Sequence, residues 1–305
     1  MTRRHIVKEG SVWAIDRRCT QRYFLFTPDE AGRVAEAFWY CLAHASIKHG
    51  IEVHAALLMS THIHLVVTDV RGVRPRFKAE FHRLFALCIK SIRGWPEEVF
   101  SQRKGGEHEP LTEEALVEDL AYLIANPVAA LAVRHADEWP GAKTVSADIG
   151  NRVIRATRPD VYFRRTSGQW PDILELRLTM PRLLEERFGA EGARQRIAAR
   201  VREKELAALG HSHASRTPFR GLQAVLRTPH TARASEHEIA GRANPRFRAA
   251  GDRQAARRKL QELRRFDTEY KRAFAEWRSG NRNAVFPHGT WWMRVHHRAR
   301  CWPPP

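Results

Sequence analysis

Two histidines, His62 and His64, lie two residues apart in an apolar run rich in β-branched residues. In a β-strand, successive side chains alternate between faces, so both imidazoles point one way while Ile63 and Leu65 enter the opposite face. Two imidazoles on one sheet face provide half of a metal site. The spacing therefore predicts a metal-binding histidine pair, and a surface or hydrogen-bonded core position is the alternative for such a pair.

A second candidate group lies downstream, where Tyr122 and Asn126 precede Pro127. Residues four apart share one side of an α-helix, and the proline favours an end to that helix. A phenol is a poor nucleophile until it loses its proton, since its reference pKa is about 10. Cleavage of a phosphodiester by Tyr122 would need a divalent cation, with the Asn126 amide as a ligand. Taken separately, Tyr122 is typical of a core aromatic and Asn126 of a helix end.

The segments that must position these residues alternate between strand and helix patterns. Strand patterns cover residues 11–26, 51–59, 62–68 and 99–102, and helical spacing covers residues 27–50, 75–93 and 112–125. Strand, helix, two strands, helix, strand, helix is the order of a ferredoxin-like domain. We therefore predict an α+β fold, in which a ferredoxin-like antiparallel sheet with helices on one face precedes a mostly helical, basic C-terminal region.

The remainder of the chain is less regular. It favours strands at 155–165, 173–180 and 290–295, and helices at 182–209 and 251–278. A length of 305 residues allows two domains, which we predict to be residues 1–150 and 151–305.

The positive charge of the chain lies in its second half. The net charge is +18, and the sequence pI is about 10.6. Residues 1–150 hold 19 Lys and Arg and 19 Asp and Glu, which leaves 33 basic and 15 acidic residues in 151–305. Such a balance favours a polyanionic partner, nucleic acid first and an anionic membrane surface second. A solubilising, arginine-rich composition is the alternative.

Cysteine usage and hydropathy indicate the compartment. The four cysteines are scattered and form no CxxC pair, which argues against a zinc ribbon or a disulfide scaffold and favours a reducing cytoplasm. No apolar run follows the basic N-terminus, and no apolar stretch approaches the roughly 20 residues that span a bilayer. We therefore expect a cytoplasmic protein with no membrane partner.

Four short segments, taken together and in order, resemble the HUH single-tyrosine transposases, in particular the REP-associated tyrosine transposase branch. The segments are residues 17–22, 59–64, 122–128 and 139–141. The Pro-Asn that usually precedes the first histidine in the family reads Ser60-Thr61 here, which leaves the histidine pair in place. Residues 151–305 resemble the C-terminal extension of a long-chain subgroup.

The resemblance implies metal-dependent nicking and rejoining of single-stranded or hairpin DNA, in DNA transposition, through a 5′-phosphotyrosine. It implies Tyr122 as the nucleophile, His62, His64 and Asn126 as ligands of Mg²⁺ or Mn²⁺, and residues 1–150 as the catalytic domain. Residues 151–305 would then be a DNA-binding or accessory region. Some family members complete each site with the partner's tyrosine helix, so a monomer and a homodimer both remain open.

Arginines provide candidate DNA contacts in two regions. Arg17, Arg18 and Arg22 lie in an extended segment that either follows a phosphate backbone or forms a charged strand edge that discourages aggregation. In the second half, an arginine-rich helix with nearby aromatics is either a single-strand-binding surface or a solvated helix face. The residues concerned are Arg253, Arg257, Arg258, Arg264, Arg265, Arg272, Phe274, Trp277, Trp291 and Trp292.

Three functions follow from these observations. The first is a transposase-type DNA nickase and strand transferase with Tyr122 as the attacking group. The second is a domesticated, non-catalytic nucleic-acid-binding protein on the same scaffold. The third is a metal-dependent hydrolase that attacks with metal-bound water and gives Tyr122 no role. A DNA adduct on tyrosine would distinguish the first function from both others.

Overall fold

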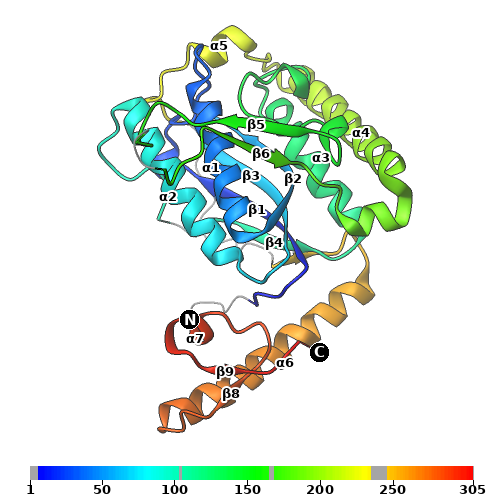
Figure 1. The fold of residues 1–305 in the computed structure, drawn as a ribbon. Helices are drawn as coiled ribbons and strands as arrows, with labels where there is room; N and C mark the ends of the chain where they lie inside the picture. Colours follow the sequence, from blue (N-terminus) through cyan, green and yellow to red (C-terminus); the bar gives the residue numbers. More distant parts are fainter. Residues whose placement is uncertain (1–5, 103–104, 165–167, 235–245, 305) are drawn as a thin grey trace.

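The computed structural model describes residues 6–102, 105–164, 168–234 and 246–304. Its centre is a five-stranded sheet in the order β2-β3-β1-β4-β7 (Figure 1). The strands are β1 (Ser11–Arg18), β2 (Ile51–Leu58), β3 (His62–Asp69), β4 (Glu107–Pro110) and β7 (Phe247–Arg248). The first four pair antiparallel, and β7 joins β4 in parallel. This arrangement confirms the predicted α+β fold, to which the C-terminal half adds an edge strand.

Helices α1 (Arg33–His49) and α2 (Arg74–Arg93) cover one face of the sheet. Alternate residues of β3, including Leu65, enter this face and pack in one hydrophobic core with phenylalanines such as Phe81. Gly50 ends α1 in the left-handed conformation, with φ of 65°, which glycine adopts without a Cβ clash.

The opposite face is covered by α3 (Glu113–Ala129), against which α4 (Arg182–Ser215) packs. The Thr112 side chain caps α3 by accepting a hydrogen bond from the Ala115 backbone N–H at 3.2 Å. The helix continues two residues past Pro127 and ends at Ala129, so the proline lies in its last turn. Helices therefore lie on both faces, and α3 covers the face that the histidines share.

The chain beyond residue 150 completes both hydrophobic cores. The hairpin of β5 (Val153–Thr157) and β6 (Ile173–Arg177) packs beside α1 and places Leu176 in the core under α1 and α2. The predicted strand at 155–165 ends at Thr157, and residue 165 lies outside the described residues. Helix α4 contributes apolar side chains such as Ile197 to the core under α3. The boundary at residue 150 stays a prediction, and the packing of the described residues continues across it.

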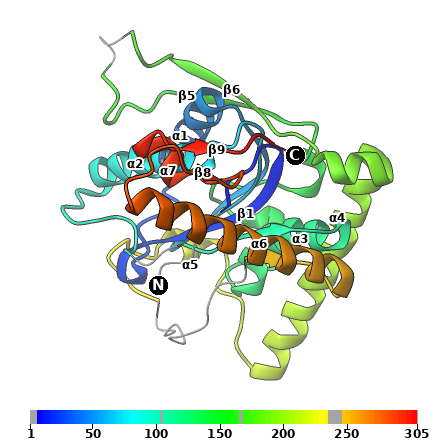
Figure 2. The same cartoon turned by 90° about the horizontal axis from the view of Figure 1, so that it is seen from below.

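The last part of the chain forms a small module below the sheet (Figures 1 and 2). It contains α6 (Arg253–Arg278), β8 (Val285–Phe286), α7 (Trp292–His297) and β9 (Arg300–Cys301), with a core that includes Phe286. Ion pairs connect α6 to the rest of the molecule, at 2.5 Å from Lys8 to Glu262 and 2.6 Å from Lys259 to Glu109.

The short elements complete the order along the chain. They are α5 (Leu222–Leu226) and the 3-10 turns Thr20–Arg22, Ala136–Glu138 and Ser146–Asp148. Among the described residues, no helix combines the length and apolar character needed to cross a bilayer.

Two further sequence predictions differ from the structure. The segment at 290–295 contains most of α7 rather than a strand. A segment of six residues is too short to distinguish the helical period of 3.6 residues from the strand period of two. The fourth strand is β4 at 107–110, whereas Phe100 makes only a single bridge, to Cys19. The segment around Phe100 and strand β4 run along the same edge of β1. Gly106 allows the chain to come close to β1 there, because a Cβ at this position would overlap the Asp16 carboxylate.

Candidate active site

The two histidines share one face of a strand that is paired on both sides. β3 lies between β1 and β2, and the His62 and His64 ring centroids are 4.6 Å apart. The turn before the pair is closed by a hydrogen bond of 2.9 Å from the Met59 N–H to the His62 carbonyl. The buried Trp139 indole donates to the Leu58 carbonyl at 2.9 Å, which anchors the same turn from outside the strand. The pair is therefore held on a rigid element.

Helix α3 brings Tyr122 and Asn126 to the histidines. The Tyr122 ring meets the His64 ring edge to face, with centroids 5.7 Å apart. The Asn126 side chain hydrogen-bonds to His62. Asn126 is buried at 7% exposure, whereas Tyr122 is 47% exposed, so the phenol faces both the pair and the solvent. The structure thus brings together all four residues singled out by spacing, from two elements on one face of the sheet.

Burial favours the neutral form of both imidazoles. Burial, with a smaller contribution from the positive charge of Arg18, lowers the pKa of His64 to about 4. Burial also lowers the pKa of His62 well below its usual value, helped by the neighbouring His64 and Arg18. A neutral imidazole keeps a nitrogen lone pair, which is the form that binds a metal ion.

The donor set fits a divalent cation. The Nε2 atom of His64 is buried and has no hydrogen-bond partner among the described residues, so it is available to a ligand. The Thr61 hydroxyl lies 2.9 Å from His62 Nδ1 and sets the orientation of that ring. No group of three His, Cys, Asp or Glu side chains suited to a metal occurs in the described parts of the chain. A site here would therefore use the Asn126 amide oxygen as its third protein donor.

The three arginines of the N-terminal segment have different positions. Arg18 is exposed and pairs in register with His62 across the sheet, so it shares the histidine face. Arg17 points to the opposite face, where its guanidinium lies 5.7 Å from the Phe100 ring centroid. Arg22 lies in the turn after β1, with its carbonyl accepting a hydrogen bond from the Ala234 N–H. Of the three, the structure places Arg18 beside the pair.

Sequence reasoning missed Asp16. It pairs in register with His64, and its charge raises the pKa of His62 against the larger effect of burial. Its carboxylate accepts a hydrogen bond of 3.1 Å from the Gly106 N–H, which fixes the side chain beside the site. The signal was available, because Asp16 is two residues before Arg18 in a strand and must share its face.

The aromatic residues predicted to lie on the basic C-terminal surface divide into two sets. Phe274 and Trp277 pack against the core of the module, so they are not free to stack on a base. Trp292 is 60% exposed, and the Trp291 ring lies 5.7 Å from the Arg294 guanidinium. The exposed aromatic surface is thus at α7 rather than along α6.

The predicted arginines of α6 mostly face solvent. Arg265 and Arg272 pair with acidic residues one turn later, Glu269 at 2.7 Å and Glu276 at 4.0 Å. The remaining four, all exposed, are Arg253, Arg257, Arg258 and Arg264.

Comparison with known proteins gives one distant structural likeness. No protein-family model and no curated protein matches this sequence. The chain resembles a solved structure of a REP-associated tyrosine transposase bound to a REP hairpin, with a TM-score of 0.38 and 17% sequence identity. The superposition covers 56% of this chain and 95% of that chain. The proposed function therefore rests on the residues of the site itself.

Proposed function

We propose that this protein is a metal-dependent DNA nickase and strand transferase of the transposase type, acting on single-stranded or hairpin DNA with Tyr122 as the nucleophile. The observation that carries the proposal is the convergence of Tyr122 and Asn126 from α3 on His62 and His64 of β3. A half-exposed phenol beside two imidazoles and an amide is better placed to attack a phosphodiester than to fill a hydrophobic core.

The proposed step exchanges one phosphodiester for another. The Tyr122 oxygen forms a bond to the phosphorus, and the bond from phosphorus to the 3′ oxygen of the preceding nucleotide breaks. The phenol proton passes to solvent, which the half-exposed side chain contacts, and the leaving 3′ oxygen takes up a proton. The products are a 5′-phosphotyrosine and a 3′-hydroxyl, and attack by that hydroxyl or another strand's hydroxyl restores a DNA phosphodiester.

The residues around Tyr122 prepare the site for a phosphate. His62, His64 and Asn126 would hold Mg²⁺ or Mn²⁺, whose charge polarises a phosphate and stabilises negative charge on its oxygens. Arg18, exposed beside His62, would contribute a positive charge to a phosphate of the DNA backbone. The Thr61 hydroxyl keeps the His62 ring in its orientation.

The basic C-terminal module would add DNA affinity at a second surface. Residues 277–305 contain five arginines and no Asp or Glu, and their exposed tryptophans are Trp292 and Trp302. Positive charge interleaved with exposed aromatic rings suits a single strand, because rings stack on bases while arginines neutralise phosphates.

A covalent-adduct assay tests the proposal. The full chain is incubated with 5′- and 3′-labelled hairpin DNA and Mn²⁺, and the products are separated under denaturing conditions. A labelled protein band that carries the DNA 3′ of the nick, joined through its 5′ phosphate, supports the proposal. Cleavage without an adduct favours the metal-dependent hydrolase, and tight binding without cleavage favours the domesticated binding protein.

A further inference from the structure

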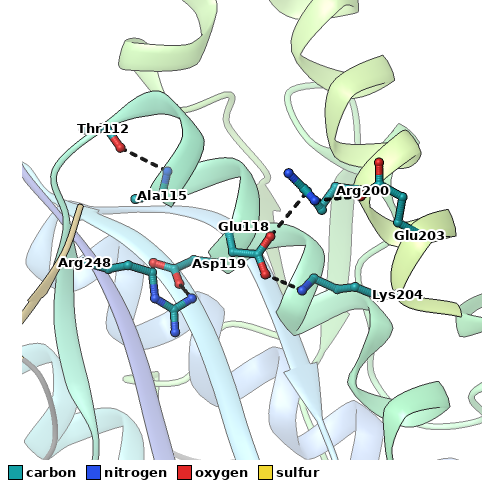
Figure 3. A network of polar contacts seen from close by, with 8 residues as sticks. All are labelled: Thr112, Ala115, Glu118, Asp119, Arg200, Glu203, Lys204 and Arg248. Atoms are coloured by element: carbon teal, nitrogen blue, oxygen red, sulfur yellow. Dashed lines mark hydrogen bonds and ion pairs between the residues drawn. The ribbon is translucent and has the colours of Figure 1, made fainter. Parts of the chain in front are cut away.

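Two adjacent acidic residues hold α3 one turn before the candidate nucleophile. Glu118 and Asp119 precede Tyr122 by four and three residues, so they lie close to it along the helix. Their side chains point to opposite flanks of α3, as Figure 3 shows. Each contacts residues of the C-terminal half of the chain.

On one flank, Asp119 ties the helix to the edge of the sheet. Its carboxylate is 3% exposed and bonds both to His108 Nε2, at 2.8 Å, and to the Arg248 guanidinium. His108 belongs to β4 and Arg248 to β7. Arg248 is fixed in turn, because its carbonyl accepts a hydrogen bond of 2.8 Å from the Leu111 N–H. A buried carboxylate with two such partners is a strong, directional contact.

On the other flank, Glu118 ties α3 to α4. Its carboxylate contacts the Lys204 ammonium and lies 3.4 Å from Arg200 Nε. The two helices also share an apolar interface in which Leu116 and Leu120 of α3 pack with Ile197 of α4. Helix α3 is therefore restrained on two sides by segments that come after residue 150.

We propose that the C-terminal half positions the tyrosine helix, with Arg248 and Lys204 as positioning residues that hold Tyr122 against the histidine pair of the same chain. The inference rests on the proposed function for its catalytic consequence. The contacts oppose both rotation of α3 about its axis and its movement away from the sheet, since they act on opposite flanks. A displacement of the reacting atom by about 1 Å can reduce a rate on the order of 100-fold.

The test uses full-length Arg248→Gln, Lys204→Gln and the double variant. Arg177→Gln and Arg187→Gln are matched controls, because each removes one exposed positive charge, from β6 and from α4 respectively. Arg248→Lys is the conservative variant that keeps the charge opposite Asp119. Circular-dichroism melting verifies that every variant is folded, and Lys204→Gln, at a partly exposed pair, serves if Arg248→Gln is unfolded.

Two measurements decide the outcome. Hydrogen exchange of α3 amides without DNA should accelerate in the Gln variants and stay unchanged in the controls. The single-turnover rate of adduct formation at saturating hairpin DNA should fall about 10- to 100-fold, while the DNA Kd stays within about threefold of the matched control. Arg248→Lys should restore most of the rate.

Unchanged α3 exchange, or a loss of rate no larger than that in the controls, overturns the positioning role. A loss that appears in Kd instead of the rate also overturns it and makes these residues DNA contacts. If the wild type forms no adduct, the proposed function fails, and the exchange measurement alone then supports or overturns the restraint on α3.

Discussion

The rings of Tyr122 and His64 meet edge to face, with centroids 5.7 Å apart and planes at 88°. One ring comes from helix α3 and the other from β3, a strand paired on both sides, so the contact joins two separate elements of the fold. The contact also places a solvent-facing phenol beside a buried histidine nitrogen that has no hydrogen-bond partner in the described parts of the chain. This combination leads to the following predictions.

Tyr122→Phe should abolish the DNA adduct while leaving the fold and the DNA affinity intact, because it removes only the attacking oxygen. The measurement is adduct formation on labelled hairpin DNA, with binding followed by fluorescence anisotropy. Tyr162→Phe is the control, since Tyr162 is similarly exposed at 43%. Adduct formation at the wild-type rate in Tyr122→Phe would mean that another group attacks.

His64→Ala should weaken Mn²⁺ binding by at least about tenfold. Loss of a residue that only hydrogen-bonds to a metal ligand lowers metal affinity by about 10- to 100-fold, and loss of the ligand itself should cost at least as much. Isothermal titration of the full chain with Mn²⁺, without DNA, measures this independently of activity. His211→Ala removes an exposed histidine from α4 and should leave the affinity unchanged. Equal Mn²⁺ affinities for wild type and His64→Ala would place the metal elsewhere.

Removing positive charge from the C-terminal module should reduce the salt dependence of DNA binding. Each lost phosphate contact lowers the slope of log affinity against log salt by about 0.7 on single strands. A triple variant, Arg278→Gln with Arg298→Gln and Arg300→Gln, should therefore lose up to about 2 units of slope. Residues after 150 complete the hydrophobic cores, so substitution is a cleaner test than truncation.

The matched control for this triple variant has the same loss of charge on another surface. It combines Arg177→Gln, Arg187→Gln and Arg196→Gln, which are exposed on β6 and α4. If both triple variants lose the same slope, the effect is one of net charge, and the module is no dedicated DNA surface.

His54 should make the protein less stable in mild acid. It is fully buried, with ring nitrogens 2.9 Å from the Thr179 carbonyl and 2.7 Å from the Thr68 hydroxyl, and burial lowers its pKa to about 4. Between pH 6.5 and about 4 the unfolded chain binds a proton that the folded chain does not. The free energy of unfolding should therefore fall by roughly 2–3 kcal/mol as the pH drops from 6.5 to 4. Above pH 6.5, His54 is neutral in both states and its stabilising contribution is fully present.

Urea unfolding at several pH values measures this loss. His54→Gln, which does not titrate, should be less stable at pH 7 and should lose less stability between pH 6.5 and 4 than the wild type. Parallel pH profiles for the two proteins would show that His54 does not control this dependence.

Local rules were enough to single out the residues of the candidate site. The two-residue period of a strand placed His62 and His64 on one face, and the helical period placed Tyr122 and Asn126 on one side. The same alternation put Arg17 and Arg18 on opposite faces, although their charges alone do not distinguish them. These relationships depend on backbone geometry within one element, so the sequence contains them in full.

Tertiary structure decided everything that depends on contacts between distant segments. The two pairs meet only because α3 packs across the histidine face of the sheet, and its angle depends on apolar side chains from α4. Glu118 and Asp119 also bind Lys204 and Arg248, which lie more than 80 residues away, a separation that no local period encodes. The sequence alone thus determined which residues share a face, whereas long-range packing decided which faces meet.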